Sequence, residues 1–251
     1  MKLLSLFTTL LLIASSNAAD DYAAETFAGT NGALPYRFLS PATIQPETKY
    51  PLVIFLHGAG ERGDDNIRQL HHGGSLFLDA DTRRKFPAFV IFPQCPDGKR
   101  WVEVDWGDPK PHQQPKGPSA AMSPLIELIP ELLKSKPIDT SRVYVMGISM
   151  GGFGVWDLAA RHPDWFAAAV PICGGADDST APLLARMPIW TFHGDQDNTV
   201  KTGRTRSMVE ALRKAGGNPK YSELPGIAHN SWSPAFANPD LLPWLFAQKR
   251  P

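Results

Sequence analysis

The chain has 251 residues, of which 43% are hydrophobic, and its 25 Lys and Arg residues balance 25 Asp and Glu residues. A chain of this size can bury one large core, so we expect one domain over residues 19–251. The even charge balance argues against a nucleic-acid partner and against a membrane partner of the mature chain, because both present negative charge that attracts a basic excess.

The first 18 residues have the order of features found in secretory signal peptides. Lys2 precedes an apolar run from Leu3 to Ala14, and small residues at 16–18 offer a cleavage site. We therefore expect residues 1–18 to be removed and the mature protein to be secreted or periplasmic. The alternative is a retained membrane anchor, but a spanning helix needs about 20 apolar residues, and this run is shorter.

Short apolar runs alternate with helical stretches through the rest of the chain. The runs predict buried parallel strands at 50–58, 88–95, 142–149, 166–175 and 187–195. The helical stretches lie at 119–135, 151–163 and 200–216. This alternation is typical of an α/β fold, with a mostly parallel central sheet flanked by helices on both faces. Pro130 should kink the first helix or shift its start.

Residues 97–118 contain proline, glycine and charge without periodicity, which predicts a long surface loop. Long loops in compact domains are often functional. No long apolar insertion follows the predicted strands, so we expect no large lid over the site.

The motif GISMGGFG at residues 147–154 contains the G-x-S-x-G pattern of a nucleophile elbow. A predicted strand runs up to Ser149 and a predicted helix follows it. Such a sharp turn forces the serine into an unfavourable backbone conformation, and Gly147 and Gly151 leave room for the neighbouring chain segments to approach. The helix beginning at Met150 directs N–H groups toward a developing oxyanion. Ser149 is therefore the candidate nucleophile; the alternative is a small residue in a glycine-rich loop.

A serine nucleophile needs a base and a group that orients the base. In such a fold the partners follow in the order Ser, Asp, His. His229 lies in a late loop and is the candidate base. Asp197 is preferred as its partner because it is set back from a strand end, whereas Asp195 is expected to shape the turn. Asp177 and Asp178 are weaker alternatives.

The other histidines are expected to serve structure. His162 and His193 are expected to cap a helix and shape a turn, and His112 is either solvated or touches substrate. Three more stand close together in the sequence: His57, His71 and His72. No zinc motif accompanies them, so we expect neither a metal nor a cofactor.

Tryptophans flank the predicted site loops. Trp101, Trp106 and Trp232 are candidate substrate contacts, since their rings stack on sugars or aromatic acyl groups. The alternative for each is local packing of an irregular loop. For Trp232 we favour packing that positions the loop of His229.

Several stretches resemble the α/β-hydrolase superfamily, and most closely a group of bacterial secreted esterases labelled as predicted peptidases or phospholipase/carboxylesterase-like proteins. They are LHGAGERGDDN (56–66), PQCPDGKRW (93–101), the segment 138–175, TFHGDQDNTV (191–200) and AHNSW (228–232). The resemblance implies an α/β-hydrolase fold with a triad of Ser149, Asp197 and His229. It also implies an oxyanion hole formed by the backbone N–H groups of Ala59 and Met150.

The strand order of this superfamily bears on the two cysteines. It places Cys95 and Cys173 at the ends of strands separated by two others, roughly 14 Å apart at about 4.8 Å per strand. A disulfide needs Cα atoms within about 7 Å. We therefore expect two free, mostly buried thiols.

Three functions stay open at this point. The first is a secreted hydrolase of carboxylic esters that works through an acyl-enzyme on a small-molecule or polysaccharide-linked substrate, such as acylated carbohydrate or phenolic esters. The second is a serine peptidase of the prolyl-oligopeptidase type. The third, a non-catalytic extracellular binding protein, is the least favoured, because all the triad residues are present in the right order.

Overall fold

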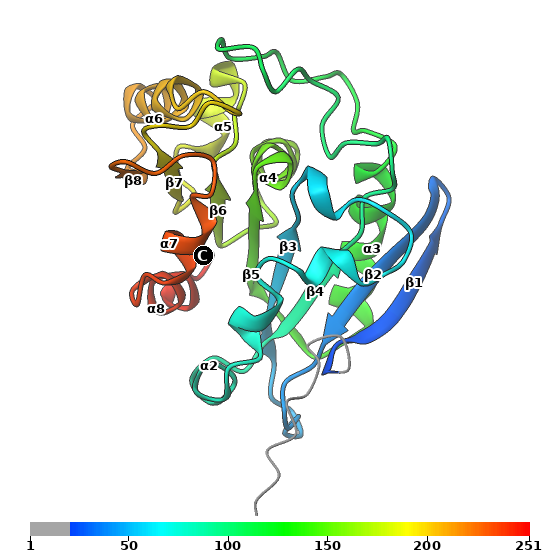
Figure 1. Ribbon diagram of the computed structural model, residues 1–251. Helices are drawn as coiled ribbons and strands as arrows, with labels where there is room; N and C mark the ends of the chain where they lie inside the picture. The colour runs from blue at the N-terminus through cyan, green and yellow to red at the C-terminus, as the bar shows by residue number, and fades with distance from the viewer. Residues whose placement is uncertain (1–20) are drawn as a thin grey trace, which may run out of the picture.

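The computed structural model describes residues 21–251, which fold around one open sheet (Figure 1). The predicted signal peptide lies outside the described residues. The strands are β1 (Ala23–Gly29), β2 (Gly32–Leu39), β3 (Tyr50–Leu56), β4 (Phe89–Pro93), β5 (Ile138–Ile148), β6 (Ala168–Ile172), β7 (Trp190–Gly194) and β8 (Lys220–Leu224). The helices are α2 (Ala80–Lys85), α3 (Met122–Ser135), α4 (Met150–Arg161), α5 (Ala181–Leu184), α6 (Gly203–Lys214), α7 (Trp232–Phe236) and α8 (Leu241–Ala247). Within this part of the chain, no helix is long and apolar enough to cross a membrane.

The strands follow the order β1-β2-β4-β3-β5-β6-β7-β8 across the sheet. All pairs from β4 to β8 are parallel, and only β1 and β2 run antiparallel at one edge. The prediction of a mostly parallel sheet is confirmed. Parallel strands end at the same edge of the sheet, so the loops after β3 to β8 gather at one end of the molecule.

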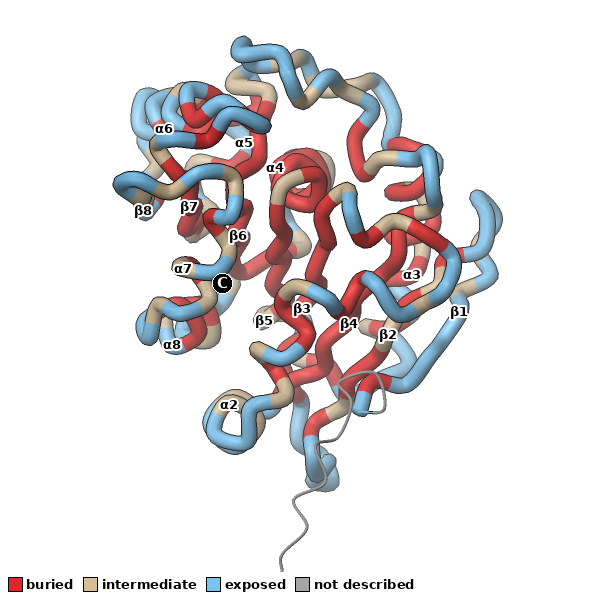
Figure 2. Tube along the Cα trace, in the orientation of Figure 1, coloured by how far each residue is buried: buried red, intermediate tan, exposed pale blue. Residues whose placement is uncertain are grey.

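Both faces of the sheet are covered, which explains why the central strands are continuous apolar runs. Side chains alternate between the faces: Leu52 and Ile54 of β3 lie in the core shared with α3, α4 and α6. Their neighbours Val53 and Phe55 lie in a second core closed by α7 and α8. Figure 2 shows the central strands buried along their length, with exposed residues on α2, β1 and the outer loops.

Two edges of the sheet were not predicted from the sequence. The strands β1 and β2 form a hairpin in which Gly29 pairs with Gly32 across a two-residue turn. The strand β1 is largely exposed, so its residues do not form an apolar run. The opposite edge strand, β8, is likewise only partly buried.

The helix α3 bears on one of the two expectations for Pro130. It begins at Met122 and continues through Pro130 to Ser135, so the proline does not shift its start. Pro130 is exposed, and the backbone carbonyl that loses its hydrogen bond on that side of the helix can be satisfied by water.

The two cysteines lie as predicted. Cys95 follows β4 and Cys173 follows β6, with β3 and β5 between them. Both are free and buried. Burial raises the pKa of the Cys95 thiol to about 12, so the thiol is protonated at neutral pH.

Candidate active site

Ser149 occupies a strained turn between β5 and α4. Its backbone has φ 52° and ψ −118°, outside the regions that an L-residue ordinarily adopts. The turn is held by a hydrogen bond of 2.9 Å from the Ser149 N–H to the Ile172 carbonyl of β6. Glycine is required beside it, because a Cβ atom on Gly147 would lie 2.6 Å from the Gly151 carbonyl oxygen.

Three side chains form a hydrogen-bonded chain from this turn into the protein interior. The His229 Nε2 atom lies 2.8 Å from the Ser149 Oγ atom, and the His229 Nδ1 atom lies 2.7 Å from Oδ2 of Asp197. The Asp197 side chain is fully buried, whereas that of His229 is 23% exposed. The arrangement leads from a buried carboxylate through an imidazole to a hydroxyl that solvent can reach.

The Asp197 carboxylate is held in its charged form despite burial. Its Oδ1 atom accepts the backbone N–H groups of Thr199 and Val200 at 2.8 and 2.9 Å. Burial raises the pKa of Asp197, but hydrogen bonds from His193, His229 and the Val200 backbone outweigh it and hold the pKa well below its usual range. The carboxylate is therefore a fixed negative charge beside the imidazole.

The other three aspartates considered from the sequence lie elsewhere. Asp195 accepts the Gly226 N–H at 2.8 Å and so braces the loop after β8. Asp177 accepts the Gln114 N–H, and Asp178 accepts the Ser207 hydroxyl. Of these four carboxylates, only that of Asp197 hydrogen-bonds His229.

Two histidines differ from the expectation drawn from the sequence. His193 does more than shape a turn, because its Nε2 atom lies 3.1 Å from Oδ2 of Asp197. His112 is not simply solvated: its Nδ1 atom lies 2.6 Å from an Arg204 nitrogen, and its ring stacks on Phe153. Burial and the Arg204 charge lower the pKa of His112 to about 4.

The loop after β3 lies close to the serine. A Cβ atom on Gly58 would lie 3.7 Å from the Ser149 Cβ atom. Ala59 and Met150 each begin a helical segment, where the first N–H groups have no partner within the helix. No turn or loop hydrogen bond among the described residues uses these two N–H groups, and the Arg62 Nε donates to the Ala59 carbonyl at 2.8 Å.

The three tryptophans occupy different surroundings. Trp101 is fully buried and donates its ring N–H to the His57 carbonyl, so the expectation that it contacts substrate is wrong in this structure. Trp106 is partly buried, with the Arg100 guanidinium 4.5 Å from its ring centre. Trp232 packs edge-on against His229, with ring centres 5.5 Å apart, which agrees with a packing role.

A cysteine lies beside the chain of hydrogen bonds. The ligand atoms of Cys173, Asp197 and His229 all lie within 4.8 Å of one another. However, burial raises the pKa of the Cys173 thiol, and both ring nitrogens of His229 already face Asp197 and Ser149. Both ring nitrogens of His229 are therefore occupied by hydrogen-bond partners.

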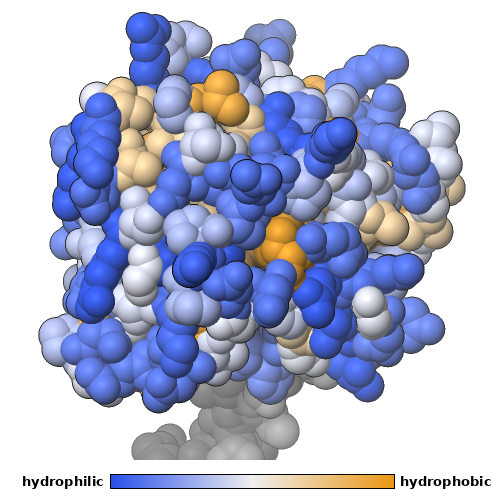
Figure 3. Space-filling view, turned by 90° about the horizontal axis from the view of Figure 1, so that it is seen from above, coloured by the Kyte–Doolittle hydropathy of each residue, from blue (hydrophilic) through white to orange (hydrophobic). Residues whose placement is uncertain are grey.

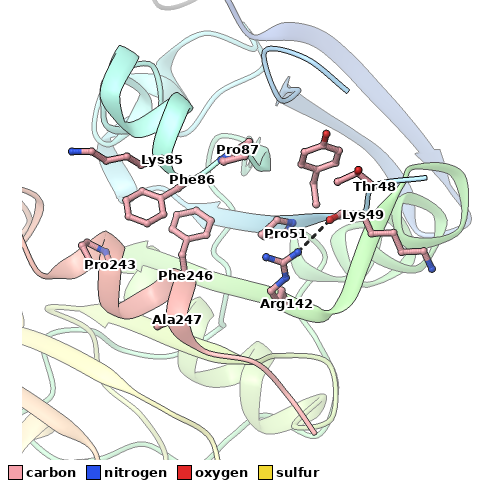
Figure 4. Close-up of a pocket in the computed structure, with 11 residues that line it drawn as sticks. Thr48, Lys49, Pro51, Lys85, Phe86, Pro87, Arg142, Pro243, Phe246 and Ala247 are labelled. Atoms are coloured by element: carbon pink, nitrogen blue, oxygen red, sulfur yellow. Dashed lines mark hydrogen bonds between the residues drawn. The ribbon is translucent and has the colours of Figure 1, made fainter. Parts of the chain in front are cut away.

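A cavity of about 550 Å³ lies away from this chemistry (Figure 4). Tyr50, Phe86, Arg142 and Phe246 are among the residues that line it, and Tyr50 is the first residue of β3. Ser149 follows the carboxyl end of β5, so the cavity and the serine lie at opposite ends of the sheet. Figure 3 shows the molecule from above, relative to the view of Figure 1. This face is mostly hydrophilic, with scattered apolar residues.

An open, mostly parallel sheet with a strained serine turn after a central strand, and with aspartate and histidine on later loops, defines an α/β-hydrolase. The chain belongs to the phospholipase/carboxylesterase family, which matches residues 41–238. Its fold superposes on the crystal structure of a thermostable esterase with a TM-score of 0.85 and 37% identity, covering 93% of this chain and 64% of that one.

Two proteins of similar sequence are named for an activity. Poly(3-hydroxyalkanoate) depolymerase C of Paucimonas lemoignei is 27% identical over 224 residues, covering 75% of this chain and 51% of that protein. Feruloyl esterase B of Thermothelomyces thermophilus is 26% identical over 144 residues, covering 57% of this chain and 46% of that protein. The chain thus spans about half the length of these relatives.

Proposed function

We propose that the protein is a secreted serine hydrolase that cleaves carboxylic esters through an acyl-enzyme on Ser149. The observation that carries the proposal is the 2.8 Å separation between the Ser149 Oγ and His229 Nε2 atoms, with a buried Asp197 carboxylate on the far side of the imidazole. A hydroxyl in this position can be deprotonated as it attacks a carbonyl.

The reaction has two stages. His229 takes the Ser149 proton as Oγ bonds to the ester carbonyl carbon, and then gives this proton to the leaving alcohol as the ester C–O bond breaks. Water next attacks the acyl-enzyme, and His229 transfers a proton from that water back to Ser149 as the acid leaves. In each stage Asp197 stabilises the imidazolium that forms.

The developing oxyanion needs hydrogen-bond donors. The N–H groups of Ala59 and Met150 suit this role in the proposal, since neither makes a turn or loop hydrogen bond within the described residues. Gly58, which precedes Ala59, lies close to Ser149. Losing one such donor typically costs about 10²- to 10³-fold in kcat.

The substrate is proposed to be an acylated carbohydrate or a phenolic ester. Relatives described as feruloyl esterase B and as a bifunctional acetylxylan esterase/xylanase support this class. Trp106 and Trp232 are the remaining aromatic candidates for contact with it.

The signal-peptide pattern at 1–18 supports export, with 19–251 as one domain.

The first experiment treats the purified mature protein with a fluorophosphonate probe and locates the label by peptide mass spectrometry. The label should lie on Ser149, and Ser149→Ala should take no label and lose about 10⁴-fold or more in kcat with p-nitrophenyl acetate. Normal turnover by Ser149→Ala would refute the proposal. Faster cleavage of a peptide anilide than of the ester would favour the peptidase alternative.

The second experiment compares acetyl, butyryl and feruloyl esters. A phenolic ester hydrolase should prefer the feruloyl ester over the butyryl ester by at least about tenfold in kcat/KM, which corresponds to about 1.4 kcal/mol of transition-state binding. An acetyl-carbohydrate hydrolase should instead prefer the acetyl ester and release acetate from acetylated xylan. A preference for butyryl over both would overturn the proposed substrate class.

A further inference from the structure

His193 lies in β7, four residues before Asp197, and its side chain is fully buried. Its Nε2 atom lies 3.1 Å from Oδ2 of Asp197 and 2.9 Å from the Val200 carbonyl oxygen. Its Nδ1 atom lies 2.7 Å from the Thr205 Oγ1 atom. The ring thus joins the carboxylate of the hydrogen-bonded chain to α6.

The partners of His193 decide where its protons lie. The Nε2 atom faces two groups that only accept hydrogen bonds, so Nε2 carries a proton. The Thr205 hydroxyl can donate to Nδ1 or to the Gly174 carbonyl, which lies 2.9 Å away. In either case the single Nε2–H group of His193 is shared between the Asp197 carboxylate and the Val200 carbonyl.

This contact gives the Asp197 carboxylate its fourth hydrogen-bond donor. Oδ2 of Asp197 receives one ring N–H from His229 and one from His193, while Oδ1 receives two backbone N–H groups. Two donors on each oxygen fix the plane of the carboxylate. They also divide its negative charge between two imidazoles, which limits how strongly it stabilises a proton on His229.

We propose that His193 is a positioning residue for ester hydrolysis: its Nε2–H orients the Asp197 carboxylate and tunes the basicity of His229. The inference rests on the proposed function of Ser149. His193 does not itself reach the substrate, because it is buried behind Asp197.

Other ionisable groups near this pair must be considered in any pH experiment. The Cys173 thiol packs beside Asp197 and His229, and its raised pKa keeps it neutral. Glu223 of β8 interacts electrostatically with His193, and Arg206 of α6 neutralises Glu223 through an ion pair. His72 and His229 both pack against Trp232, and His72 Nε2 lies 3.7 Å from the carboxylate of Glu61 in the loop after β3.

The test compares His193→Leu with His193→Gln in the full mature chain. Leucine removes the donor at similar bulk, whereas the glutamine amide can place an N–H group near the Nε2 position. For His193→Leu, kcat should fall about ten- to a hundredfold with KM within about twofold. The pH midpoint of kcat/KM should rise by about 0.5 to 1 unit, because the unshared charge on Asp197 favours protonated His229.

His193→Gln should recover at least about half of the lost log kcat and most of the midpoint shift. Wild-type kcat and midpoint in His193→Leu would overturn the proposal. Equal losses in both variants with an unmoved midpoint would also overturn it, since those losses would reflect structure alone. Thermal unfolding of each variant confirms that a folded protein is compared.

A second readout separates this inference from the proposed function. The proton between His229 Nδ1 and Asp197 should give a low-field proton resonance, which requires no turnover. Its chemical shift should change in His193→Leu and return toward the wild-type position in His193→Gln. An unchanged resonance overturns the role of His193, whereas failure of Ser149 to react with a fluorophosphonate overturns the hydrolase proposal.

Discussion

The carbonyl oxygen of Leu56 lies 1.9 Å from the position that a Cβ atom would take on Gly151. The helix α4 therefore packs directly on the end of β3, and this close approach keeps Ser149 above the sheet. Gly151→Ala should destabilise the fold by about 3 kcal/mol or more, because backbone on both sides must move. Urea unfolding measures the loss of stability, and fluorophosphonate labelling measures whether Ser149 is still held in a reactive position.

Gly203→Ala is the matched control for this prediction. Nothing lies within 4 Å of a Cβ atom at Gly203, and alanine in a helix loses less backbone entropy than glycine. Its stability should be unchanged or higher by up to about 1 kcal/mol. Equal stability of the two variants would show that the helix and the strand are not in close contact.

The two aspartates after β7 offer a second contrast. Asp197→Asn leaves an amide where His229 needs a charged acceptor, so kcat should fall by about 10⁴-fold, as in other serine triads. Asp195→Asn keeps an oxygen for the Gly226 N–H and should retain kcat within about twofold. Steady-state kinetics with p-nitrophenyl acetate decide; comparable losses in both variants would contradict the assignment of Asp197.

The parts of this molecule that sequence reasoning predicted are those fixed by local pattern. The apolar runs of β3 to β7 are continuous because both sheet faces are covered, and the G-x-S-x-G turn carries its own glycines. The order of Ser149, Asp197 and His229 followed from the elbow motif and from the chain order expected of such a fold. The geometry of the hydrogen-bonded chain agrees with that order.

The parts that were missed depend on contacts between distant segments. The exposed strand β1 has no apolar run, and the two residues of its turn, Thr30 and Asn31, are not one of the glycine-containing pairs that signal a hairpin. The burial of Trp101 depends on the His57 carbonyl, 44 residues earlier. His193 was expected to shape a turn. Its contact with Asp197 depends on the path of the loop after β7, which a local sequence pattern does not show.

His57 should make the fold sensitive to mild acid. Burial lowers the pKa of His57 to about 4, and its Nε2 atom accepts the Cys95 N–H at 2.9 Å, which requires the neutral ring. Because the folded pKa lies below the unfolded value of about 6.5, the unfolded chain binds this proton first. The contribution is complete above about pH 6.5 and is lost as the pH falls toward about 4, by on the order of 3 kcal/mol.

Urea unfolding at a series of pH values measures this loss. His57→Gln should be less stable at neutral pH but should show a flatter dependence between pH 6.5 and 4. His71→Gln changes an exposed ring and should keep the wild-type slope. A wild-type slope in His57→Gln would mean that another group causes the acid sensitivity.

Arg204 should hold the long loop between β4 and α3 in place. It is fully buried, and its guanidinium donates to the carbonyl oxygens of Asp105 and Asp108 at 2.8 and 3.2 Å. Arg204→Met keeps much of the side-chain volume but leaves these carbonyls and His112 without their donor. Limited proteolysis should then cut within residues 105–112 at least about tenfold faster, because local opening of the loop becomes easier.

Arg206→Met provides the control from the same helix. Arg206 lies on the surface, where its side chain is 53% exposed and pairs with Glu223, and such pairs contribute about 0 to 1 kcal/mol. Its proteolysis pattern should match that of the wild type. If Arg204→Met is cut no faster than Arg206→Met, the loop is held by its own packing, with Trp106 and Phe153 as the first contacts to test next.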